Sequence, residues 1–234
     1  MYPIIVLAGG LATRLRPATD LVPKSLIDLS GTPFIEHQLR LFRARGIRQV
    51  VICVGHLGER IRDRVGDGVR FDLAVRYSFD GPTLLGTAGA IAQALPLLDS
   101  PFFVVYGDSY LPCDYRAIQD AFDRAGKPAL MTVFQNEGRW EGSNVELRDG
   151  RIVAYDKRCP NPAMRHIDYG LGVFDRSAFD LVPPARPADL ATLYRRLLER
   201  DALAACEVAE RFYEIGSFEG LAETRRFLAE IGGG

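Results

Sequence analysis

Glycines, two arginines and a lysine follow the first apolar stretch of the chain. Residues 2–6 predict a buried strand, Gly9-Gly10 comes soon after it, and Arg14, Arg16 and Lys24 follow. Glycines let backbone N–H groups approach an anion closely, and arginine and lysine supply its positively charged partners. The combination predicts a phosphate-binding loop. A tight turn that carries solvated arginines is the alternative interpretation.

The spacing of these residues differs from that of two common phosphate loops. The dinucleotide fingerprint G-x-G-x-x-G is not present after the first strand, and Lys24 follows a proline rather than the glycine of a P-loop. The pattern therefore disfavours a dinucleotide-dependent oxidoreductase.

Strand and helix patterns alternate through the first half of the chain, and this alternation decides where the loop lies. Strands are predicted at 2–6, 49–54, 73–78, 102–106 and 129–134, with helices at 33–46, 57–65, 86–95 and 115–125. Such alternation is typical of an α/β fold, a Rossmann-like, mainly parallel (mixed) sheet with helices on both faces. Ligands of these sheets bind beyond the carboxyl ends of the strands, where both Gly9-Gly10 and Asp108 fall.

The pattern changes after residue 140. A hairpin is predicted over 144–155 around Asp149-Gly150, then a strand at 169–174 and helices at 189–200 and 219–231. We expect a single domain over 1–234, with a nucleotide-binding half (1–135) and an acceptor-binding half (136–234) that contains a small β subregion.

The loop and the two segments after it resemble the signature of the sugar-1-phosphate nucleotidyltransferase family. Leu7 to Thr19 supplies the first block, with Ala12 where the family usually has glycine. Pro23-Lys24-Ser25-Leu26 supplies the second block and Gly31-Thr32-Pro33 the third. The resemblance covers most of the chain and weakens in the last third.

The resemblance implies a reaction. An NTP and a sugar 1-phosphate would give an NDP-sugar and pyrophosphate by direct in-line displacement, with Mg²⁺ as cofactor. Short members of the family include heptose-1-phosphate guanylyltransferases and muramate-1-phosphate uridylyltransferases, and resemblance to the heptose type slightly favours GTP. No serine or cysteine shows a pattern that supports a covalent intermediate.

Two carboxylates are candidate metal ligands. Asp108 follows a buried strand and Gly107, and matches the family's G-D motif; a helix cap is the alternative role. Glu214, in Tyr213-Glu214-Ile215, stands where the family usually has aspartate. Because choline-phosphate-type members can show a comparable segment, a cytidylyltransferase acting on phosphocholine or a phosphonate is an alternative function. A non-catalytic nucleotide-sensing homologue is another.

The resemblance also implies the remaining roles. The catalytic cations are Arg14, Lys24 and Lys157, of which Lys157 would hold the acceptor phosphate. The nucleotide-binding residues are Leu7, Gly9, Gly10, Thr13, Gly86, Thr87 and Gly107. The acceptor-binding residues are Asn144, Asp156, Asp168 and Gly170, with Trp140 and Ser143 in the same neighbourhood; for Trp140, core packing or a lid is the favoured role. By pattern alone, Gly86-Thr87 is only the start of a helix. In the acceptor segments, Asp156 stands where the family usually has glutamate, and Asp168 where it usually has asparagine.

Composition limits the partners. The chain has 234 residues, 47% of them hydrophobic and 25% charged, with a net charge of −1. This predicts no binding to nucleic acid or to a membrane surface. The four scattered cysteines lack zinc-site spacing, which is typical of reduced thiols in the cytoplasm. We expect a cytoplasmic monomer or homodimer whose partners are the NTP and the sugar 1-phosphate.

Overall fold

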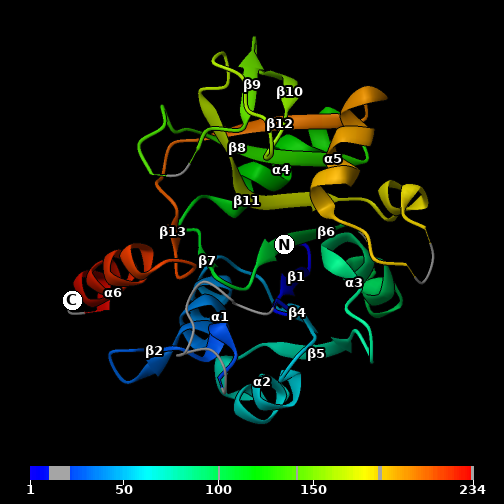
Figure 1. The fold of residues 1–234 in the computed structure, drawn as a ribbon. Coiled ribbons are helices and arrows are strands. Elements are labelled where there is room, and N and C mark those ends of the chain that lie inside the picture. Colours follow the sequence, from blue (N-terminus) through cyan, green and yellow to red (C-terminus); the bar gives the residue numbers. More distant parts are fainter. Residues whose placement is uncertain (11–21, 100, 141, 184–185, 233–234) are drawn as a thin grey trace.

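The computed structural model describes residues 1–10, 22–99, 101–140, 142–183 and 186–232 (Figure 1). The strands are β1 (Ile4–Leu7), β2 (Asp28–Leu29), β3 (Thr32–Pro33), β4 (Gln49–Val54), β5 (Ala74–Phe79), β6 (Phe102–Tyr106), β7 (Ser109–Tyr110), β8 (Ala129–Gln135), β9 (Val145–Arg148), β10 (Arg151–Tyr155), β11 (His166–Phe174), β12 (Leu203–Val208) and β13 (Tyr213–Glu214). The α-helices are α1 (Phe34–Ala44), α2 (Gly58–Val65), α3 (Gly86–Ala94), α4 (Tyr115–Ala125), α5 (Leu190–Glu199) and α6 (Phe218–Gly232). Short 3-10 turns are η2 (Lys24–Leu26), η3 (Val69–Phe71), η4 (Leu95–Leu97) and η5 (Arg176–Leu181).

One sheet of nine strands runs through the described part of the chain. Its neighbours follow the order β5-β4-β1-β6-β11-β8-β12, and the β9-β10 hairpin joins at β11. The β5-β4-β1-β6 block is parallel, β12 is parallel to β8, and β11 is antiparallel to both β6 and β8. The expected mainly parallel, mixed sheet is confirmed.

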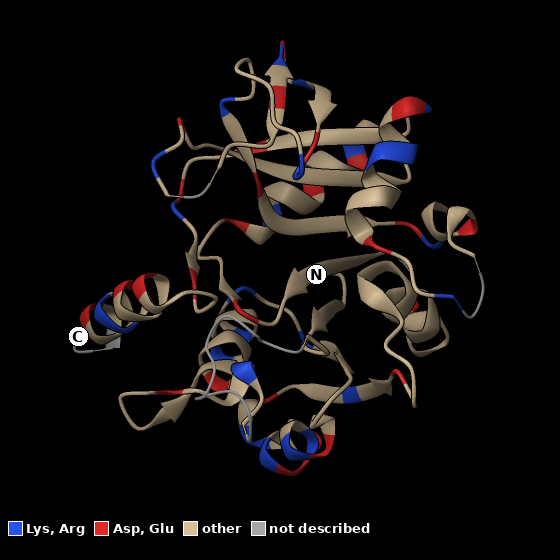
Figure 2. Ribbon diagram, viewed as in Figure 1, with Lys and Arg blue, Asp and Glu red and all other residues tan. Residues whose placement is uncertain are grey.

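Helices cover both faces of this sheet, as the sequence predicts. Successive strand residues point to opposite faces, so Ile4 and Val6 pack with α1, α2 and α4, whereas Ile5 packs with α3 and α5. These three residues are almost completely buried. Strands buried on both faces are continuous apolar runs, which explains why β1, β4 and β6 could be recognised in the sequence. Charged residues lie mainly on the outer helices and loops, as in α2 (Figure 2).

Two features of the fold were not predicted. β12 has the sequence Leu-Ala-Ala-Cys-Glu-Val, which is too weakly apolar to indicate a strand, yet it pairs along its whole length with β8. The short strands β7 and β13 also pair, and this brings the chain near Glu214 next to Asp108. Their length of two residues leaves no periodicity to read.

The C-terminal helix α6 holds β13 in place. Leu228 of α6 packs in a separate apolar cluster with Phe34 of α1, Tyr110 of β7 and Ile215. Figure 1 shows α6 beside the α1 side of the molecule, away from β11 and β12. Among the described residues, no helix is long and apolar enough to cross a membrane.

Gly172 of β11 tests the packing between the sheet and α5. A Cβ at this position would overlap the Tyr194 hydroxyl and the Phe174 ring. We expect Gly172→Ala to lower the free energy of unfolding by roughly 1–3 kcal/mol through overpacking. The measurement is thermal unfolding followed by circular dichroism. Gly142→Ala is the matched control, because open space surrounds its Cβ position; equal melting temperatures for the two variants would contradict the packing described.

Candidate active site

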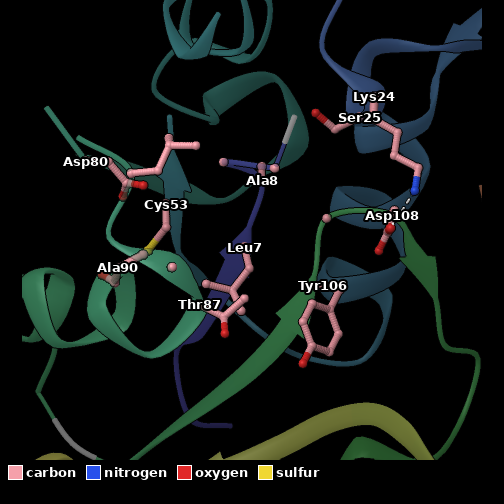
Figure 3. Close-up of a pocket in the computed structure, with 15 residues that line it drawn as sticks. Leu7, Ala8, Lys24, Ser25, Cys53, Asp80, Thr87, Ala90, Tyr106 and Asp108 are labelled. Carbon is pink, nitrogen blue, oxygen red and sulfur yellow. Dashed lines mark hydrogen bonds and ion pairs between the residues drawn. The ribbon is translucent and has the colours of Figure 1, made fainter. Parts of the chain in front are cut away.

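Two cavities meet at the carboxyl ends of β1 and β6. The first cavity encloses about 270 Å³ and the second about 660 Å³. The first is lined by Leu7, Ala8, Gly9, Gly10, Lys24, Ser25, Cys53, Asp80, Leu84, Gly86, Thr87, Ala90, Tyr106, Gly107 and Asp108 (Figure 3). The second is lined by Lys24, Tyr106, Asp108, Ser109, Gly142, Ser143, Asn144, Lys157, Pro160, Ile167, Asp168, Tyr169, Gly170, Phe212, Glu214 and Gly216. Three residues belong to both, so the cavities meet at Lys24, Tyr106 and Asp108.

The sheet places Asp108 at this junction. Leu7 and Tyr106 are partners in the parallel pairing of β1 with β6, so the two strands end side by side. Gly107 follows, and its N–H donates to the Leu7 carbonyl oxygen at 2.9 Å. A Cβ on Gly107 would lie 2.9 Å from that oxygen and 3.1 Å from the Ala8 Cα, so the close approach of the two chain segments requires glycine.

Lys24 reaches the same point from the 3-10 turn η2. Its Nζ lies 2.6 Å from Asp108 Oδ2, and the side chains of Lys24 and Asp108 are 17% and 37% exposed. Figure 3 shows this ion pair with Ser25 beside it. A cation and a carboxylate held together at a partly buried junction form a polar point between two ligand-sized spaces.

Glu214 lies near Asp108 because β13 pairs with β7. Glu214 is the partner of Ser109, and the Ile215 N–H donates to the Asp108 carbonyl oxygen at 2.9 Å. The Glu214 carboxylate accepts hydrogen bonds from the Ser217 hydroxyl at 2.6 Å and from the Gly216 N–H. It lines the second cavity together with Asp108.

The donor set fits Mg²⁺. Asp108 and Glu214 offer hard carboxylate oxygens in one cavity, and Asp108 remains partly exposed. The described residues contain no group of three or more potential ligands among histidine, cysteine, aspartate and glutamate. Mg²⁺ is bound in many sites by one or two carboxylates, with water and substrate phosphate as its other ligands. Two carboxylates are therefore sufficient to hold Mg²⁺, but they are too few for a metal ion whose ligands all come from the protein.

Lys157 is the second cation of the larger cavity. Its Nζ lies 3.0 Å from Asp168 Oδ2 and 5.4 Å from the centre of the Tyr106 ring. Asn144 fixes the backbone beside Lys157. Its side-chain Oδ1 accepts from the Asp168 N–H at 2.9 Å, and its backbone N–H donates to the His166 carbonyl oxygen.

Most residues expected from the sequence lie in these two cavities. Those in the first are Leu7, Gly9, Gly10, Gly86, Thr87 and Gly107. Those in the second are Asn144, Lys157, Asp168, Gly170 and Glu214, with Lys24 and Asp108 in both. Thr13, Arg14 and Arg16 lie outside the described residues.

Asp156 is not brought to the site. Its Oδ1 accepts from the N–H groups of Arg158 and Cys159 at 2.7 and 3.0 Å, and the residue lines neither cavity. These two backbone hydrogen bonds lower the pKa of its carboxyl group. Aspartate directly after a strand often binds the backbone two residues on, and here this local turn takes the place of the expected acceptor contact.

Gly86 and Thr87 have a further role beside lining the first cavity. Gly86 has a φ of +69°, and a Cβ there would lie 2.6 Å from the Ala188 carbonyl oxygen. The Thr87 hydroxyl accepts from the Leu190 N–H at 2.7 Å and donates to Asp189 Oδ1 at 3.0 Å. The two residues thus join the start of α3 to the start of α5, and the backbone there requires glycine at position 86.

Ser25 and Tyr106 line the cavities and were missed by sequence reasoning. The Ser25 side chain is almost wholly buried, and its hydroxyl has no hydrogen-bond partner among the described residues. Its position directly after Lys24 is the signal that could have found it. Tyr106, the last residue of a buried strand, gives no such signal. Trp140, for which the sequence favours core packing over an acceptor contact, packs on Phe134 and Phe212 and lines neither cavity.

Comparison with known proteins defines the class of this chain. Residues 3–230 match the nucleotidyl transferase family, and the chain belongs to that family. The resemblance stated from the sequence is confirmed, as is the expectation of an enzyme of the nucleotidyltransferase class.

Individual relatives differ in the substrates that their names give. The chain is 42% identical over 227 residues to an N-acetylmuramate alpha-1-phosphate uridylyltransferase of Neisseria meningitidis serogroup B, covering 94% of this chain and 96% of the relative. It is 30% identical over 185 residues to a mannose-1-phosphate guanylyltransferase of Mycobacterium tuberculosis, covering 78% of this chain and 51% of that protein. The crystal structure of HddC from Yersinia pseudotuberculosis has the same fold, with a TM-score of 0.82, 21% identity and coverage of 97% and 100% of the two chains.

The unpartnered hydroxyl of Ser25 generates a prediction for nucleotide affinity. We expect Ser25→Ala to weaken NTP binding by roughly 10-fold, the effect of losing one hydrogen bond to a charged group. Isothermal titration calorimetry without acceptor measures it. Ser177→Ala is the control, because Ser177 carries an exposed hydroxyl bonded to Asp175. Unchanged affinity in Ser25→Ala would show that its hydroxyl does not face the nucleotide.

Proposed function

We propose that this enzyme transfers a uridylyl group from UTP to N-acetylmuramate α-1-phosphate and releases pyrophosphate. The observation that carries the proposal is a pair of cavities joined at Lys24 and Asp108, in a chain that matches a uridylyltransferase with this acceptor over nearly the whole length of both proteins. GTP, which resemblance to the heptose type favours, is the competing donor.

The chemistry of the walls supports one substrate for each cavity. The first cavity is lined by glycines and apolar side chains such as Leu84 and Ala90, which suit a planar base beside close backbone. The second is lined by amide, hydroxyl and charged groups, including Ser143 and Asn144, which suit a sugar with many hydroxyls. We therefore place the NTP in the first cavity and the sugar 1-phosphate in the second.

The transfer step needs negative charge to be gathered at the junction. A phosphate oxygen of the acceptor attacks the α-phosphorus, a new P–O bond forms, and the bond to the β-phosphate bridging oxygen breaks with its electron pair leaving on pyrophosphate. Lys24 stabilises charge on the α-phosphate, and Lys157 binds the acceptor phosphate. Asp108 and Glu214 would hold Mg²⁺, which when bound supplies positive charge to the reacting phosphates. Arg14, outside the described residues, is proposed as a further triphosphate contact.

The two alternatives drawn from Tyr213-Glu214-Ile215 gain no support. The relatives reported above are named for sugar 1-phosphate acceptors, not for phosphocholine, and cationic residues for catalysis are retained at Lys24 and Lys157.

Because the proposed reaction consumes a nucleoside triphosphate, we place it in the cytoplasm. Monomer or homodimer stays a prediction.

A substrate matrix tests the proposal. Pyrophosphate release is measured with Mg²⁺ for four NTPs, each combined with N-acetylmuramate α-1-phosphate, other sugar 1-phosphates and phosphocholine. The expected result is the highest kcat/KM for UTP with N-acetylmuramate α-1-phosphate. Preference for GTP with a heptose phosphate, or for CTP with phosphocholine, would overturn the proposal.

The junction residues give a second test. We expect Asp108→Asn and Lys24→Ala each to lower kcat by ~10²–10³-fold or more, because Lys24 stabilises charge on the α-phosphate and Asp108 would hold Mg²⁺. Circular dichroism checks that the fold is kept. Lys127→Ala is the matched control. Lys127 pairs with exposed Asp201 at the same distance of 2.6 Å, and neither residue lines the two cavities. Normal turnover in folded Asp108→Asn would contradict the assigned role.

A further inference from the structure

The Asp168 carboxylate is occupied by groups of the protein itself. The side chain is only 2% exposed. Its Oδ2 accepts from Lys157 Nζ at 3.0 Å and from the Tyr155 hydroxyl at 3.1 Å, and its Oδ1 accepts from the Gly170 N–H at 3.1 Å. Three of its roughly four lone-pair sites are thus used by the protein, and its burial leaves little access for a sugar hydroxyl.

The backbone of β11 is shaped around Asp168. The Asp168 N–H donates to Asn144 Oδ1, and the register of β11 against β8 shifts between Asp168 and Gly172. Gly170, within this irregular stretch, has a φ of +95°, and the Thr132 hydroxyl donates to the Leu171 carbonyl oxygen at 2.5 Å. The carboxylate is therefore held at a fixed place in the cavity wall.

Lys157 lies between this carboxylate and open space. Its side chain is 39% exposed, lines the second cavity and lies 5.4 and 6.0 Å from the ring centres of Tyr106 and Tyr155. Burial by itself lowers the pKa of Lys157, but Asp168, Tyr106 and Asp189 together raise it above its ordinary value. An ammonium group has three N–H donors, so Lys157 can keep Asp168 and still donate to a ligand.

We propose that Asp168 is a positioning residue, which fixes the Lys157 ammonium toward the second cavity and does not contact the sugar. The proposal rests on the proposed function, in which Lys157 binds the acceptor phosphate. It replaces the role in sugar recognition that the resemblance implied for position 168. A buried carboxylate with three protein donors is suited to hold a cation in place, and removing one partner leaves the other charge uncompensated.

The lysine content of the chain allows a test without substrate. Its 234 residues contain three lysines, Lys24, Lys127 and Lys157, so lysine-specific labelling with ¹³C gives three Cε signals whose titration reports each pKa. The groups that face Lys157 are Asp168, Tyr106 and Asp189 together with the Tyr155 hydroxyl bonded to Asp168.

In Asp168→Asn we expect the pKa of Lys157 to fall, because burial remains and the facing carboxylate is lost. The signals of Lys24 and Lys127 should not move. Asp201→Asn is the matched control and should affect Lys127 alone, since these two residues pair on the surface. An unchanged Lys157 titration in Asp168→Asn would overturn the proposal, whatever the enzyme's substrates are.

Kinetics distinguish positioning from sugar contact. We expect Asp168→Asn to lower kcat/KM by roughly 10- to 100-fold, and by the same factor for every sugar 1-phosphate that the wild type accepts. Lys157→Met and the double variant Lys157→Met/Asp168→Asn should be equally slow, because Asp168 acts only through Lys157. If Asp168→Asn alone does not fold, comparing Lys157→Met with the double variant still tests the proposal. The double variant leaves no unpaired charge.

Two kinetic outcomes would contradict the positioning role. They are a loss in Asp168→Asn that depends on the sugar, and a further loss in the double variant beyond that of Lys157→Met. Failure of the proposed function shows itself differently, as wild-type protein that is inactive on the whole substrate matrix while the Lys157 titration still responds to Asp168→Asn.

Discussion

The Lys24 ammonium and the Asp108 carboxylate lie 2.6 Å apart where the two cavities meet, and the fold around them serves to bring them to this point. Asp108 is placed by the adjacent ends of β1 and β6, which can approach only because Gly107 has no side chain. Lys24 is placed by the turn η2. Coulomb attraction between the two charges is stronger at this partly buried position than in bulk water. Because both residues line both cavities, the pair marks the boundary between the two substrate spaces.

Two of the three lysines of the chain line the second cavity, and they differ in how their partners are held. Asp168 is buried and engaged by three donors, so the place of Lys157 is set by the protein. Asp108 is partly exposed and next to Glu214 across the β7–β13 pair, so its oxygens remain accessible to a metal ion. A reaction between two phosphates needs both kinds of group: cations fixed before the substrates arrive, and carboxylates that can take part in metal binding. The arrangement supports direct transfer between substrates bound side by side.

The sequence predicts the fold well where local signals are strong. Residues 49–54 and 102–106 are apolar runs and residues 115–125 follow the capping aspartate Asp114, and all three elements have the predicted bounds. β12 could not be predicted because most of its residues are small and because its partner strand, β8, is distant from it in the sequence. The same division holds for the site. Motifs identify Lys24. Only packing across several strands shows that Asp168 pairs with Lys157, and only the structure shows that the Asp156 carboxylate binds its own backbone.

The central claim is that the two substrates react directly at the Lys24–Asp108 junction. The stereochemistry of the α-phosphorus tests this most directly: one diastereomer of UTP with sulfur on the α-phosphate is converted in the presence of Mg²⁺, and the configuration of the sugar nucleotide is determined by ³¹P NMR. A single in-line displacement predicts inversion at the α-phosphorus. Retention would indicate two displacements through a covalent nucleotidyl-enzyme and would contradict the account.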